Sequence, residues 1–80
     1  MNNKQKRLFN QSNRILKMFY ENNNCDIEIS FDGDYLNIVF VNFRAFGWNF
    51  LEQVSIDLVE NGISWELTTN DKGYLTIRLF

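Results

Sequence analysis

Apolar positions recur with a helical period near the start of the chain. Between residues 8 and 20 they return every three or four positions, so they gather on one side of a helix opposite the basic side chains. The residues on that side are Leu8, Phe9, Ser12, Ile15, Leu16, Phe19 and Tyr20. Three asparagines follow at 22–24, and asparagine competes with the helical backbone. The pattern predicts an amphipathic helix over residues 8–20 that ends at this run.

Strict alternation then predicts a half-buried strand over residues 25–31. The Asp-Gly pair at 32–33 is typical of a type I′ hairpin turn, which would pair Ile29 with Leu36. The returning strand, residues 35–43, is apolar on both faces. Such a strand is central, or has something docked on its second side.

A second hairpin is predicted at the end of the chain. Residues 63–69 alternate, and the turn after them suits a three-residue loop with Gly73 in the left-handed conformation. This loop length pairs Leu67 with Ile77 and places the apolar side chains of both strands on one face.

Residues 49–62, between the hairpins, fit a helix. Asn49 and Glu52 have the spacing of a capping box, and Gly62 stands where a Schellman motif places glycine. The apolar stripe of this helix would be Phe50, Leu51, Val54 and Leu58.

The same segment also fits a strand. That structure would place Asp57 directly opposite Glu66, and like charges in a cross-strand pair are destabilising. The helix avoids this pair but leaves Ile56 and Val59 on its polar side. We favour the helix.

The element order α-β-β-α-β-β predicts a small single α+β domain over residues 1–80. Its antiparallel sheet would consist of the two hairpins, with the helices packed on one face. Residues 1–7 are expected to form a flexible basic N-terminus.

Composition argues against catalysis. The chain has no histidine, a single cysteine (Cys25) that alternates with the inward side chains, and four glycines that form no phosphate-binding loop. Asp32 and Asp34 are explained by the turn, since a calcium loop needs many more oxygens. We therefore expect no enzyme activity, cofactor or metal site. No stretch has the length of a membrane span or a signal-peptide core, which favours the cytoplasm.

Charge is divided along the chain. Residues 1–20 carry five basic and no acidic side chains, whereas residues 21–80 carry three basic and ten acidic ones, for a net charge of −2. Such asymmetry bears on partners rather than on fold.

The acidic part predicts a binding surface on the outward face of the sheet, where carboxylates lie among apolar and aromatic side chains. The candidate residues are Asp26, Glu28, Val41, Phe43, Glu66 and Tyr74, with Phe43 and Tyr74 as aromatic anchors. The partner would be a host protein with a basic surface, or a second copy of the chain. Usage rich in asparagine, phenylalanine and isoleucine reflects AT-rich codons and suggests a phage or mobile-element protein that inhibits a host defence protein.

The alternative function is nucleic-acid binding or regulation through the basic helix. Its candidate residues are Lys6, Arg7, Arg14 and Lys17, whose charges would release counterions from phosphates.

Overall fold

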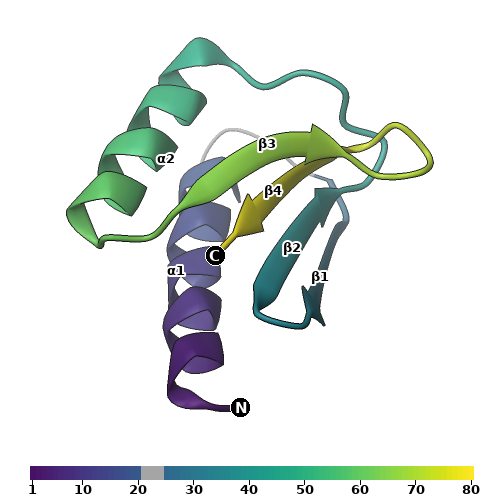
Figure 1. The fold of residues 1–80 in the computed structure, drawn as a ribbon. Helices are drawn as coiled ribbons and strands as arrows, with labels where there is room; N and C mark the ends of the chain where they lie inside the picture. Colours follow the sequence, from purple (N-terminus) through teal and green to yellow (C-terminus); the bar gives the residue numbers. More distant parts are fainter. Residues whose placement is uncertain (21–24) are drawn as a thin grey trace.

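The fold has the predicted element order. The computed structural model describes residues 1–20 and 25–80, so the asparagine run at 22–24 lies outside the described residues. The elements are α1 (Asn3–Tyr20), β1 (Ile27–Asp32), β2 (Tyr35–Phe40), α2 (Trp48–Glu60), β3 (Trp65–Thr69) and β4 (Leu75–Leu79). The strands form one antiparallel sheet in the order β1-β2-β4-β3, with both helices on one face (Figure 1). The predicted α+β class is confirmed.

Helix α1 begins at Asn3, five residues before the predicted start. The side-chain oxygen of Asn2 accepts a hydrogen bond from the Gln5 backbone N–H at 2.8 Å. The Gln5 side-chain oxygen accepts one from the Asn2 N–H at 3.1 Å, which completes a capping box. Residues 3–7, expected to be a flexible start, are therefore the first turn of the helix.

The first hairpin differs from the predicted register by two residues. Ile29 pairs with Ile38 rather than with Leu36. The turn is centred on Gly33 and Asp34, and the positive φ of +60° falls on Gly33, as in a type II′ turn. Because the shift is even, every side chain keeps its predicted face.

The second hairpin has the predicted register. Trp65 pairs with Leu79, Leu67 pairs with Ile77, and Gly73 has a φ of +78°. This agreement follows from the turn chemistry, because a three-residue loop with a left-handed glycine fixes the pairing on both sides.

Strand β2 ends at Phe40, three residues before the predicted end. Asn42 has a φ of +62°, and the Phe43 N–H donates to the Phe40 carbonyl at 3.0 Å. This turn interrupts the alternation, and the Phe43 ring lies 5.2 Å from the ring of Phe19 on the helix side. The prediction that Phe43 belongs to the outward face is wrong.

Residues 48–60 form a helix, so the alternative strand over this segment is wrong. Its N-cap is Gly47 and makes no side-chain capping hydrogen bond, so the predicted capping box is absent as well. The C-terminal prediction is confirmed. The Ile63 N–H donates to the Leu58 carbonyl at 3.0 Å and the Gly62 N–H to the Val59 carbonyl at 3.1 Å, which is a Schellman motif.

Replacing Gly62 with alanine is expected to lower the free energy of unfolding by about 1 kcal/mol, because its φ of +65° strains any residue with a Cβ. Gly62→Asn is the matched control, since asparagine tolerates the left-handed conformation better than alanine does. Urea denaturation of both variants measures the difference. Equal losses for both substitutions would show that the left-handed conformation carries no cost.

An aromatic cluster joins the helices to the sheet. Phe19 of α1 is fully buried, with ring centroids 4.8 Å from Phe40 of β2 and 5.5 Å from Phe50 of α2. Phe46, in the connection before α2, lies 4.7 Å from Phe40. The remaining buried apolar residues are Leu8, Ile15, Leu36, Ile38, Val54, Leu58, Ile63, Ile77 and Leu79.

Candidate functional site

The sheet face opposite the helices carries most of the predicted binding residues. Strand pairing aligns Glu28, Val39, Thr76 and Thr68 in one row across the sheet. The Val41 N–H donates to the Asp26 carbonyl at 2.9 Å, which extends the β1–β2 register by one pair and places Val41 beside Asp26. The carboxylates at the β1 edge therefore border Val39 and Thr76 of the two central strands.

Aromatic side chains lie at the other end of this outward face. The rings of Tyr35 and Phe80 are 5.5 Å apart and are 42% and 39% exposed. The Arg78 guanidinium lies 5.2 Å from the centre of the Tyr35 ring and donates to Asn37 at 2.9 Å and to Glu66 at 3.4 Å. Arginine is thus held at the centre of the face by partners on two neighbouring strands.

Phe43 is partly buried and packs against the core on the helix side of the sheet. The other predicted sheet-face residues share the outward face: Asp26, Glu28, Val41, Glu66 and Tyr74. The sequence interpretation missed Tyr35 and Arg78 on this face. The sequence did contain a signal for these two residues. Side chains alternate along a strand, so counting from the inward-facing Ile38 and Ile77 places Tyr35 and Arg78 on the outward face.

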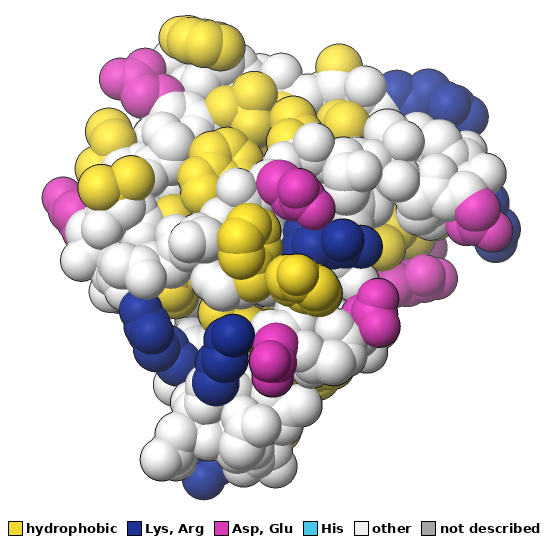
Figure 2. All heavy atoms as spheres, viewed as in Figure 1, with side chains coloured by type: hydrophobic (Ala, Val, Ile, Leu, Met, Phe, Trp, Pro, Cys, Tyr) yellow, Lys and Arg dark blue, Asp and Glu magenta, His cyan; other side chains and the backbone are white. Residues whose placement is uncertain are grey.

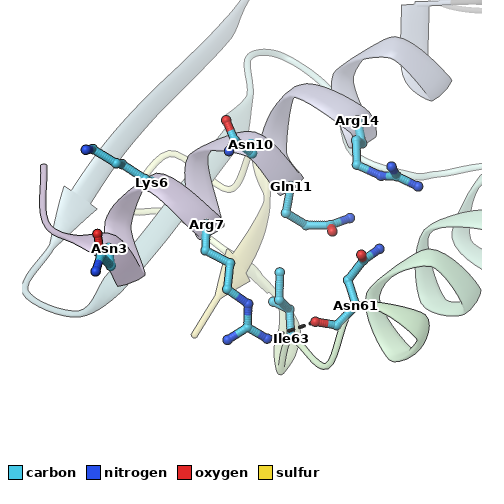
Figure 3. A pocket seen from close by; sticks show the side chains of 8 residues that line it. All are labelled: Asn3, Lys6, Arg7, Asn10, Gln11, Arg14, Asn61 and Ile63. Carbon is cyan, nitrogen blue, oxygen red and sulfur yellow. Dashed lines mark hydrogen bonds between the residues drawn. The ribbon is translucent and has the colours of Figure 1, made fainter.

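The basic face of α1 borders a groove of about 530 Å³ against the C-terminal end of α2 (Figure 3). The groove is lined by Asn3, Lys6, Arg7, Asn10, Gln11, Arg14, Asn61 and Ile63. Arg7 donates to the backbone carbonyls of Asn61 and Gly62, both at 2.8 Å. These carbonyls lie at the negative end of the α2 dipole, where a cation is stabilising. Arg7 therefore has a structural role at the end of α2.

Asp57 of α2 is buried and binds two side chains of α1. Arg14 donates to both of its carboxylate oxygens, and Gln11 donates to Oδ2 at 2.6 Å. The hydrogen bond from Arg14 holds the pKa of the Asp57 carboxyl below its ordinary value, against the opposite effect of burial. All four residues predicted to bind nucleic acid, Lys6, Arg7, Arg14 and Lys17, are exposed. Two of them also hold α2 in place: Arg14 binds Asp57, and Arg7 binds the carbonyls that follow the helix.

A third surface lies between α2 and β3 and was missed by the sequence interpretation. Its groove of about 540 Å³ is lined by Trp48, Leu51, Glu52, Ser55, Trp65 and Leu67. Figure 2 shows hydrophobic side chains gathered in this region, at the upper left. Farther along α2, Ile56 is 51% and Val59 75% exposed. The sequence signal for these two exposed residues was their position on the polar side of the helix, but they do not line the groove, whose side chains come from two elements.

Within residues 1–20 and 25–80, no three histidine, cysteine, aspartate or glutamate side chains are grouped to hold a metal ion. Burial, and next the charge of Asp26, raise the pKa of the Cys25 thiol, so its reactive thiolate is disfavoured. None of the described helices is long and apolar enough to cross a membrane.

Comparisons with known proteins do not indicate a function for this chain. No protein-family model, curated protein or solved structure matches this chain.

Proposed function

We propose that the protein is a non-catalytic binding module whose outward sheet face docks on a basic surface of another protein. The observation that carries this proposal is the placement of both helices on the opposite face, which leaves aromatic rings exposed among carboxylates (Figures 1 and 2). Apolar patches with a polar rim are typical of protein interfaces, and complementary charge speeds association. Of the two predicted aromatic anchors, Tyr74 remains a candidate. Tyr35 and Phe80 are further candidate anchors on the same face.

The kind of partner follows from charge. Basic grooves are the surfaces with which proteins hold nucleic acid, so the acidic face is suited to covering such a groove. A composition rich in residues with AT-rich codons supports a phage or mobile-element protein that inhibits a host defence protein in this way. Nucleic-acid binding through α1 has less support, because Arg7 already binds the carbonyl oxygens that follow α2 and Arg14 binds the Asp57 carboxylate.

The test compares substitutions on the outward sheet face with a substitution on α1. Glu28→Lys and Tyr74→Ala are expected to weaken binding to a purified partner by about tenfold or more, because each removes an interface group. The matched reversal on α1, Lys17→Glu, is expected to leave that affinity unchanged. Isothermal titration calorimetry measures both, using a partner isolated from the native host with the wild-type chain.

The opposite pattern of losses would contradict the proposal. If Lys17→Glu abolishes binding while Glu28→Lys does not, and if the wild-type chain binds an oligonucleotide with steep salt dependence, the sheet-face proposal is wrong. Sedimentation of the isolated chain tests whether the outward face instead binds a second copy of the protein. A dimer that dissociates on Tyr74→Ala would assign the face to self-association instead.

A further inference from the structure

Strand β3 stands at one end of the strand order and offers a second kind of binding surface. Ser64 and Phe80 exchange both backbone hydrogen bonds, at 3.1 and 2.9 Å, and the Asn70 N–H donates to the Tyr74 carbonyl at 3.0 Å. In an antiparallel pair such bonded positions alternate with positions whose groups point away. The N–H and C=O groups of residues 65, 67 and 69 therefore point away from β4, at the edge of the sheet.

Apolar side chains lie directly beside this edge. Trp65 and Leu67 of β3 and Trp48 and Leu51 of α2 line the groove described above. Trp48 is 78% and Leu67 45% exposed. A strand added next to β3 would direct every second side chain into this groove, because side chains alternate between the two faces of a sheet. The backbone edge and the groove thus fit one extended ligand.

We propose that β3 and this groove bind an extended segment of a partner protein by strand addition, and that the segment alternates apolar and basic residues. In this mode main-chain hydrogen bonds supply affinity and alternate pockets supply specificity. Exposed edges are commonly protected by proline or lysine, and β3 contains neither. The apolar residues of the ligand would enter the groove, and its basic residues would lie beside Glu66 on the outward face.

Charge selects this occupant over a second copy. Among the described residues, no lysine or arginine lines the groove, whereas Glu52 lines it. Glu66, which Arg78 contacts at 3.4 Å, lies on the outward face of β3. A second copy paired through β3 would bring the same carboxylates to the interface, whereas a basic segment would neutralise them. This surface is separate from the outward-face interface, and the proposal does not rest on it.

The probe is an acetylated and amidated peptide of alternating valine and lysine, as long as β3. Both tryptophans of the chain line the groove, so binding is expected to give a saturable change in intrinsic fluorescence. In antiparallel pairing the valines that enter the groove also hydrogen-bond to β3. N-methylation of the valine amides is therefore expected to weaken binding by about tenfold or more, and N-methylation of the lysine amides to leave it unchanged. A valine–glutamate peptide is expected to bind about tenfold more weakly or not at all.

Variants of the protein locate the site. Leu67→Pro removes a backbone N–H that points away from β4 and would bind the peptide. Ser55→Lys places a cation in the groove from the surface of α2. Each substitution is expected to weaken peptide binding by about tenfold. Circular dichroism verifies that both variants are folded. Tyr74→Ala is expected to bind the peptide normally, which separates this proposal from the outward-face interface.

Several results would overturn the proposal. These are the absence of a saturable signal at millimolar valine–lysine peptide, equal affinity for the valine–glutamate peptide, and equal effects of the two N-methylation patterns. A concentration-dependent dimer that Leu67→Pro abolishes would assign the edge to a second copy, which also overturns it.

Discussion

Replacing Phe19 with alanine is expected to lower the free energy of unfolding by about 3–5 kcal/mol. The Phe19 ring is fully buried and contacts aromatic rings from β2, α2 and the segment after β2, so its loss opens a cavity where these elements meet. Small domains are marginally stable, by about 5–15 kcal/mol, so this substitution removes a large part of the total. Urea denaturation followed by circular dichroism measures the change.

Trp48→Ala is the control for Phe19→Ala, because it also removes a large aromatic side chain but from a site that is 78% exposed. We expect a change within about 0.5 kcal/mol for this variant. Similar losses for the two substitutions would mean that the aromatic cluster does not organise the core.

The second large effect is expected for Asp57→Ala, which should lower the free energy of unfolding by about 2 kcal/mol at neutral pH. The reason is Gln11, whose buried amide donates to Asp57 and would lose its acceptor. Arg14 has an exposed side chain and is solvated when the carboxylate is removed. Glu60→Ala, on the exposed surface of α2, is the control and should change stability by less than about 0.5 kcal/mol.

The contribution of Asp57 depends on pH with a definite sign. Its pKa is lower in the folded protein than its ordinary value of 3.8, so the folded state favours the ionised carboxyl. The stabilisation is therefore fully present above the ordinary pKa and is lost as the pH falls through the folded-state pKa. The difference in stability between the wild type and Asp57→Ala should shrink in urea titrations below pH 3.8. A difference that grows on acidification would contradict this account.

Local patterns predicted the elements better than their ends. The 3.6-residue and two-residue periods identified α1 and the four described strands, because burial on one face imposes these periods. Both periods fitted the segment of α2, and the like-charge pair that a strand would make there favoured the helix. The first hairpin was misaligned because Gly33 fits either central position of a two-residue turn. The start of α1 was missed because Asn2 and Gln5, which cap it, lie outside the apolar pattern.

The candidate surfaces were predictable only where they follow from alternation. Sheet register placed Glu28 and Glu66 on the outward face, but the left-handed turn at Asn42 turned Phe43 into the core. The contacts of Arg14 with Asp57 join residues 43 positions apart, which no local pattern reveals. The α2–β3 groove likewise depends on how a helix and a strand are placed in space.

The placement of α1 and the outward sheet face on opposite sides of the domain has a consequence for how the molecule would approach the proposed basic partner. Lys4, Lys6 and Lys17 are exposed on α1, and Asp26, Glu28 and Asp32 are exposed at the β1 edge of the opposite face. This arrangement gives the domain an electric dipole moment across its layers, although the net charge is only −2. In the field of a cationic surface the molecule rotates before contact, so that its carboxylates arrive first.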